Sequence, residues 1–295
     1  MPIGELAAIA AATLWSLTSL CFVVATRRIG SLRVNLLRLP AALALLSGAL
    51  LVARPSLAPV TSPRLAALAA SAVLGLVLGD LAYFASLRRL GPRLALLLTP
   101  LTPVFAAAAG VVALGEIPGV MALAGMSVTL AGIAWVVAER GASQQADRSE
   151  RTAGLALGLA GAACQGIGLA LAKVGMAGEL DPLAAAWVRM AVAVLVSWGA
   201  LFVSGRLLTL SLVQSVRAAW PLVLAGAACG PFLGMWMSMV AATHTHVGVA
   251  STLMSTMPVL IIPLVMVTER YRPTPRAVLG AVVTVVGVAM LFLRR

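Results

Sequence analysis

Long apolar runs follow one another along the whole chain, separated by short breaks that contain charged residues, proline or glycine. A helix that spans a bilayer needs about 20 mostly apolar residues. The runs are apolar on every side rather than along one stripe, which is typical of membrane spans. The pattern predicts ten transmembrane helices, at residues 6–26, 34–53, 66–87, 94–114, 118–138, 152–172, 182–204, 218–242, 247–267 and 276–293.

The same runs argue against other membrane architectures. Strands of an outer-membrane barrel alternate apolar and polar residues, whereas the run from Ala41 to Val52 does not. The first run follows Glu5 and ends in Arg27-Arg28, and it is longer than the apolar core of a signal peptide. We therefore expect an all-α membrane protein whose first span is retained.

The longest polar break, Glu139 to Arg151, lies near the midpoint of the chain and suggests an internal repeat. When residues 66–140 are compared with residues 221–295, equivalent positions match. The matches are Gly75 with Gly230, Gly79 with Gly234, Pro103 with Pro258, Gly125 with Gly280, Thr129 with Thr284, and Gly132 with Gly287. With a slightly different shift, Arg38 matches Arg189.

Five spans per repeat have a geometric consequence, because an odd number makes the second repeat enter the membrane from the opposite side. The predicted organisation is a first repeat at 1–140, a polar linker at 141–151 and a second repeat at 152–295. Inverted repeats of this kind occur in many secondary transporters, which bind substrate near the midplane between the halves.

Composition agrees with this interpretation. Of the 295 residues, 61% are hydrophobic and 10% charged, whereas soluble domains carry about 25% charged residues. The net charge of +12 by itself suits a nucleic-acid partner. However, the 20 arginines and the single lysine gather at the ends of the spans. We interpret them as topology anchors that favour anionic lipid, and we expect no nucleic-acid partner.

Two segments carry a family resemblance. TPLTPVFAAAAGVVALGE followed by GMSVTLAGIAW, and STMPVLIIPLVMVTER followed by VLGAVVTVVGVAML, resemble the EamA-type repeat of the drug/metabolite transporter superfamily. Arg38 in NLLRLP fits the same pattern, while Thr268-Glu269 departs from the Gly-Glu of the first copy and comes two residues early. The resemblance implies a transporter that exports small metabolites and has both termini in the cytoplasm.

Signatures of other chemistry are missing from the sequence. Cys21, Cys164 and Cys229 are far apart in apolar runs, so neither a disulfide framework nor a metal site is expected. The chain contains no HExxH, GxSxG, Walker A or GxGxxG motif. We therefore predict that the protein is not an enzyme and that it uses no cofactor and no metal.

Glycine pairs and prolines mark special points within the spans. Gly75/Gly79, Gly230/Gly234 and Gly154/Gly158 have the spacing that lets helices approach closely, within one chain or between two copies. Prolines interrupt the fourth and ninth expected spans, at Pro100, Pro103, Pro258 and Pro263. The nearby hydroxyls of Thr99, Thr252 and Ser255 can either satisfy the freed carbonyls or face a central cavity.

Three charges lie inside spans, where each costs at least about 2.5–3.5 kcal/mol at a helix centre. They are Arg38, Asp80 and Arg189. Asp80 can pair with Arg38 or Arg189 as a structural ion pair, or it can titrate as a proton-coupling site. Arg189 can alternatively meet a substrate carboxylate. Further cavity candidates are the polar or aromatic side chains of Trp15, Tyr83, Gln165 and Trp236.

Charge counting and family resemblance disagree on orientation. The odd-numbered connections carry 14 Lys and Arg residues when Arg276, the first residue of the last span, is counted with them, against 5 at the termini and in the even-numbered connections. The positive-inside rule then places both termini outside.

We predict a ten-helix secondary transporter of small metabolites, such as amino acids or amphipathic compounds, that works by alternating access as a monomer or homodimer. Its expected location is a bacterial inner membrane, in contact with membrane lipid. The alternatives are a flippase for a polyprenyl carrier, which needs a cavity open to lipid and basic residues for phosphate, and a membrane scaffold that transports nothing.

Overall fold

A computed structural model describes residues 2–56, 61–139, 148–176, 179–203, 213–269 and 274–293, and every regular element in these ranges is helical. The first half contains α1 (Ile3–Ile29), α2 (Ser31–Ala53), α3 (Ser62–Ala72), η1 (Val73–Leu78), α4 (Gly79–Leu98), η2 (Thr99–Leu101), α5 (Thr102–Leu114) and α6 (Val120–Glu139). The second half contains α7 (Arg148–Met176), α8 (Pro182–Val203), α9 (Val213–Ala227), η4 (Ala228–Gly234), α10 (Met235–His244), α11 (Val247–Met254), α12 (Met257–Glu269) and α13 (Pro275–Leu293).

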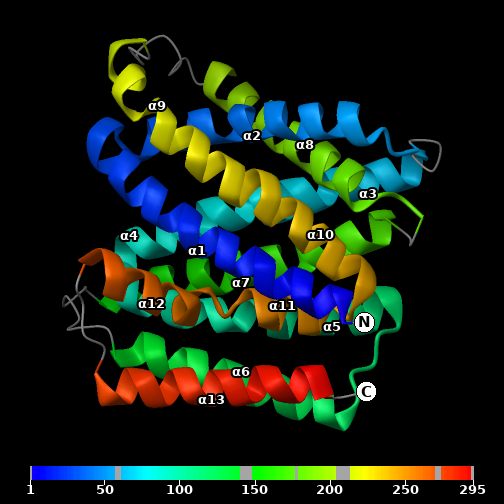
Figure 1. Cartoon of the computed structure of the whole chain (residues 1–295), viewed down its shortest axis with the longest axis vertical. Helices are drawn as coiled ribbons and strands as arrows, with labels where there is room; N and C mark the ends of the chain where they lie inside the picture. Colours follow the sequence, from blue (N-terminus) through cyan, green and yellow to red (C-terminus); the bar gives the residue numbers. More distant parts are fainter. Residues whose placement is uncertain are drawn as a thin grey trace.

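The helices lie side by side, and the chain runs back and forth between two ends of the molecule (Figure 1). The N-terminus and the C-terminus lie at the same end, on the right of the figure. Two π-helical turns, η1 and η4, occur at equivalent places in the halves, each within a long helical stretch. The repeat predicted from glycine spacing is therefore visible in the local geometry of the backbone.

Two predicted boundaries are wrong. A break between the third and fourth spans was expected at residues 88–93, but helical backbone continues through it to Leu98 and is interrupted by the 3-10 turn η2. The expected helix 247–267 is divided into α11 and α12. Proline explains the turn η2 and the division before α12, because Pro100 and Pro258 have no N–H for the helical ladder and disfavour helical backbone at the preceding residue. At residues 88–93 the charged residues indicated a connection, but the backbone there stays helical.

Among the described residues, seven helical stretches are long and apolar enough to cross a membrane. They are Ile3–Ile29, Leu36–Ala53, Ser62–Leu90, Glu150–Met176, Pro182–Val203, Ala219–His244 and Pro275–Leu293. Three shorter apolar helices are Thr99–Leu114, Val120–Val136 and Val247–Pro263. The all-helical membrane architecture is confirmed, while the count of ten spans stays a prediction.

The two halves are interlocked through their glycines. The third helical stretch of each half packs against the first helix of the other, so that η1 and α4 contact α7 while η4 and α10 contact α1. A Cβ placed on Gly79 would lie 2.9 Å from Gln165 Cγ, and one on Gly234 would lie 2.6 Å from Trp15 Nε1. The GxxxG pairs of these stretches therefore serve contacts within the chain.

A second close contact joins α6 and α13, which carry equivalent glycines and threonines. A Cβ on Gly132 would lie 2.5 Å from the backbone nitrogen of Thr284, and a Cβ on Gly287 would collide with Thr129. Thr129 and Thr284 donate their hydroxyls to carbonyls of their own helices, those of Gly125 and Gly280. The two helices consequently meet backbone to backbone, where no side chain larger than hydrogen fits at these glycines.

Gly132→Ala is expected to destabilise the protein by roughly 1–3 kcal/mol, because the added methyl group forces apart two packed backbones. Thermal unfolding in detergent measures the effect. The matched control is Gly199→Ala in α8, where an added Cβ meets nothing within 4 Å. Equal melting temperatures for the two variants would contradict the packing described for α6 and α13.

Candidate functional site

An ion pair joins α2 to α4 inside the bundle. Arg38 Nη2 lies 3.3 Å from Asp80 Oδ2, and the two side chains are 20% and 35% exposed. Gln165 Nε2 of α7 donates to Asp80 Oδ1 at 3.4 Å. The Arg38 guanidinium also lies 5.8 Å from the centroid of the Phe22 ring of α1, which adds a cation–π contact. Asp80 thus connects its own half to α7 of the other half.

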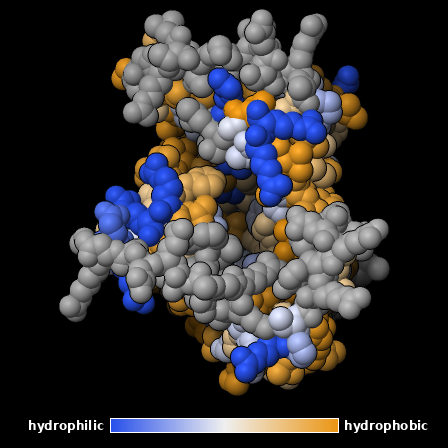
Figure 2. Space-filling model, turned by 90° about the vertical axis from the view of Figure 1, so that its left-hand side faces the viewer, coloured by the Kyte–Doolittle hydropathy of each residue, from blue (hydrophilic) through white to orange (hydrophobic). Residues whose placement is uncertain are grey.

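Asp80 keeps 35% of its side chain exposed although it lies midway along the helical stretch 62–98. Figure 2 views the end opposite the termini, where hydrophilic side chains gather around a hollow near the middle of the face. Hydrophobic side chains are also visible beside the hollow in this view. A carboxylate placed this deep in an apolar protein is typical of a water-filled approach or a functional site.

Three of the predicted cavity residues gather next to Asp80. Tyr83, Thr99 and Gln165 line a small cavity of about 10 Å³ between α4, η2, α5 and α7. Thr102 and the small residues Gly158, Gly161 and Ala162 complete much of its wall. The cavity has room for about one water molecule, so in this conformation the side chains are close to fully packed.

Other predicted residues make contacts that are local to their own stretch of chain. Thr252 and Ser255 donate to the carbonyls of Gly248 and Ser251, one turn earlier, and Trp236 stacks on Phe232 at a centroid distance of 6.3 Å. These two hydroxyls therefore donate within their own helix.

Of the four prolines predicted to interrupt spans, three occupy positions that helices tolerate. Pro100 is buried in η2, and Pro103 and Pro258 stand in the first turns of α5 and α12. Pro263 lies inside α12. Ser16 of α1 donates to the carbonyl of Met257 at 3.2 Å and so links α1 to this broken helix.

A group that we call the polar latch closes the end of the molecule at which the termini lie. It consists of Glu5 of α1, Glu116 after α5, Lys173 of α7 and Thr245 between α10 and α11. Lys173 Nζ lies 2.6 Å from Glu116 Oε1 and donates to the Thr245 carbonyl at 2.7 Å. Glu116 Oε2 accepts from the backbone N–H of Val247 at 2.7 Å, and Thr245 donates to Glu5 Oε1 at 3.2 Å.

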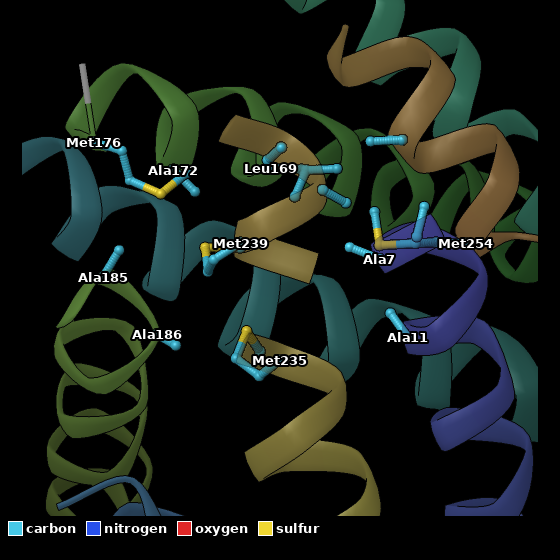
Figure 3. Packing of buried hydrophobic residues seen from close by; sticks show 14 of the residues in the cluster. Ala7, Ala11, Leu169, Ala172, Met176, Ala185, Ala186, Met235, Met239 and Met254 are labelled. Carbon is cyan, nitrogen blue, oxygen red and sulfur yellow. The ribbon is translucent and has the colours of Figure 1, made fainter. Parts of the chain in front are cut away.

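Small apolar side chains fill the space next to the latch. Alanines of α1, α7 and α8 interleave with methionines of α7, α10 and α11 in one buried cluster (Figure 3). The latch and this cluster together close the bundle at one end. Sequence reasoning missed the latch, although the only lysine of the chain and the Gly-Glu pair of the first repeat were signals for it.

Arg189 of α8 is 4% exposed, and it is the most deeply buried of the three charges inside the predicted spans. Its Nη1 lies 3.5 Å from Met235 Sδ and 3.4 Å from Met239 Sδ. Its Nε is buried and has no hydrogen-bond partner among the described residues. In the structure, Asp80 therefore pairs with Arg38, whereas Arg189 contacts methionine sulfur atoms.

A family model, that of the EamA-like transporter family, matches the chain twice, at residues 2–138 and at residues 152–293. The chain belongs to the EamA-like transporter family. The resemblance drawn from the two sequence segments is confirmed, and so is an integral membrane protein built from two EamA repeats. Members of this family are generally not enzymes.

A solved structure titled "Crystal structure of protein" is 20% identical to the chain with a TM-score of 0.81. The similarity covers 99% of this chain and 96% of that one, and it supports the fold alone. No match was found among the curated proteins.

Lys173→Met is expected to lower the free energy of unfolding by about 1.5–3 kcal/mol, because Glu116 then keeps a half-buried charge without its cation. The exposed pair Arg64–Glu179 provides the control, since the Glu179 side chain is 67% exposed. Glu179→Gln should change stability by less than about 1 kcal/mol. Thermal unfolding of both variants compares them, and an equal effect would show that the latch contributes no more than a surface pair.

Proposed function

We propose that the chain is a secondary transporter that exports small metabolites, such as amino acids or amphipathic compounds, by alternating access. The observation that carries the proposal is the family match in both halves, together with the exchange of partners between them. Each half contributes a third helical stretch that packs against the first helix of the other. Small relative movements of such halves are the usual basis of alternating access.

The contacts suggest how the two ends alternate. In this conformation the latch joins the helices at the end with the termini, while the Asp80 side chain remains 35% exposed. We propose that the latch separates when that end opens, and that the Arg38–Asp80 pair tightens or separates in the same cycle. Ion pairs and hydrogen bonds suit this task because each can be exchanged for water at a small net change in free energy.

The domain division at 1–140 and 152–295 and the ten spans belong to the same proposal, as does a bacterial inner membrane location. The three shorter apolar helices then act as further spans of the bundle. We favour the orientation given by the positive-inside rule, with both termini outside.

The structure gives the lipid-flippase alternative no specific support. An apolar groove of about 380 Å³ lies between α12 and α13, and its lining residues are Ile262, Met266, Val278, Ala281, Val282, Val285 and Val286. None of these described residues offers a charge for a phosphate head group, so we do not propose this function.

Transport is tested with purified protein in liposomes loaded with a mixture of amino acids and nucleosides, whose loss is followed by mass spectrometry. In a background that lacks Cys21, Cys164 and Cys229, the pair Glu5→Cys and Thr245→Cys is linked by a short reducible reagent. The cross-linked latch should stop solute loss, and a reductant should restore it. If the liposomes with protein retain as much solute as liposomes without protein, both before and after reduction, the transporter proposal is contradicted.

Asp80→Asn should reduce this flux at least tenfold, because Arg38 loses its counter-charge within the bundle. The pH profile of the residual flux separates the two roles considered for Asp80. A proton-coupling carboxylate requires that the variant lose the pH dependence, whereas a structural pair requires lower thermal stability with the profile unchanged. A full rate with an unchanged pH profile would exclude both.

Orientation is tested by thiol labelling in the same cysteine-free background. Pro2→Cys should react with an impermeant reagent in intact cells, and Gln144→Cys should react only after the membrane is permeabilised. The reverse pattern would place the termini in the cytoplasm, as the family resemblance implies.

A further inference from the structure

Arg189 is a buried cation whose contacts, among the described residues, offer no negative charge. It is 4% exposed, its Nη1 contacts two thioether sulfurs, and its Nε makes no hydrogen bond. Sulfur is a weak acceptor, so these contacts replace little of the hydration that the guanidinium loses. A buried charge without a partner is strongly unfavourable, and such residues within spans mark functional positions by default.

The internal repeat shows what is missing at this position. Arg189 is the equivalent of Arg38, and Met235 lies 155 positions after Asp80, the shift that relates the glycines of the two halves. Arg38 contacts Asp80, and Arg189 contacts Met235 in the same way. Both partners follow a π-helical turn, η1 or η4. The second half therefore keeps the cation and its geometry but has a methionine in place of the carboxylate.

The surroundings of the guanidinium suit a small apolar molecule. A Cβ placed on Gly75 would lie 3.4 Å from Arg189 Nη2 and 3.7 Å from Gly168 Cα, so on this side the guanidinium lies close to the backbone of glycines. Met235 and Met239 project from α10, with Ala185 and Ala186 on α8 nearby (Figure 3). Methionine side chains are flexible and adapt to different apolar shapes. They can therefore move aside and then cover the body of a bound molecule.

We propose that Arg189 binds the carboxylate of a small monocarboxylate with an apolar body, at the position that Asp80 fills in the first half. This substrate class rests on the transporter function proposed above. A guanidinium presents parallel N–H donors that match a carboxylate, and its single positive charge balances a single negative one. A phosphate dianion would leave a second buried charge without compensation among the residues that contact Arg189.

The test uses purified protein in detergent and a series of monocarboxylates from acetate to octanoate, including 4-methylpentanoate, each matched with its uncharged amide. Members with an apolar body should raise the melting temperature in a saturable way, with an apparent affinity at least tenfold higher than that of the amide. Inorganic phosphate forms a separate arm and should have no effect. If no acid exceeds its amide, or if phosphate alone stabilises the protein, the proposal is overturned.

Met235→Asp is the decisive variant, because it supplies the carboxylate that the first half already has. It should weaken the apparent affinity for the acids at least tenfold, while the melting temperature without ligand is equal to or higher than that of the wild type. Met235→Leu, which keeps the volume but adds no charge, should retain the affinity within about threefold. Arg189→Gln should abolish the difference between acids and amides. Unchanged binding of the acids by Met235→Asp would overturn the proposal even if Arg189→Gln does not fold.

The liposome assay separates the failure of this inference from failure of the transporter proposal. Flux of monocarboxylates that is equal in the wild type and Arg189→Gln would retain the transporter and reject the carboxylate site. Stabilisation by acids through Arg189 without flux of any solute would retain the site and reject transport.

Discussion

Helices in hydrocarbon gain nothing from burying apolar side chains against each other, so they associate only where their backbones pack closely. This constraint governs the whole bundle. The glycines of η1, α4 and η4 bring each third stretch onto the first helix of the other half, and those of α6 and α13 bring two backbones together. Contacts of this kind fix the spacing of the helices, while the glycines keep one of the two facing surfaces smooth, so that one helix can tilt against another. The same glycines thus hold the halves together and allow them to move.

The charges are distributed against this apolar background in a way that differs between the halves. Arg38 has an acidic partner, Arg189 has thioethers, and the latch collects Glu5, Glu116 and Lys173 at one end. An exact duplication would give two equal ion pairs and no preference between the two ends. A methionine in place of one carboxylate makes the two halves unequal at this position.

Much of the fold follows from the sequence, because long apolar runs and repeated glycines leave few alternatives for a chain with 10% charged residues. The boundary at Ser255 was harder, since the effect of Pro258 on the backbone depends on how neighbouring helices satisfy the freed carbonyls. At residues 88–93 the charged residues are typical of a connection, although the backbone there is helical. For the site, the position of Arg38, Asp80 and Arg189 inside apolar runs singled them out, but it did not decide which arginine pairs with the aspartate. The latch was beyond reach because Glu5, Glu116, Lys173 and Thr245 come from four separate parts of the chain and meet only once the helices are packed.

The composition of the latch has a practical consequence. With 20 arginines and one lysine, the chain has a single primary amine on its side chains, and that amine is bonded to Glu116 and Thr245 in this conformation. An amine-selective reagent therefore has one side-chain target in the protein, 19% exposed when the latch is formed. The unaltered chain carries its own chemical reporter of which end of the bundle is closed, and it can be read without introducing a cysteine or a fluorophore.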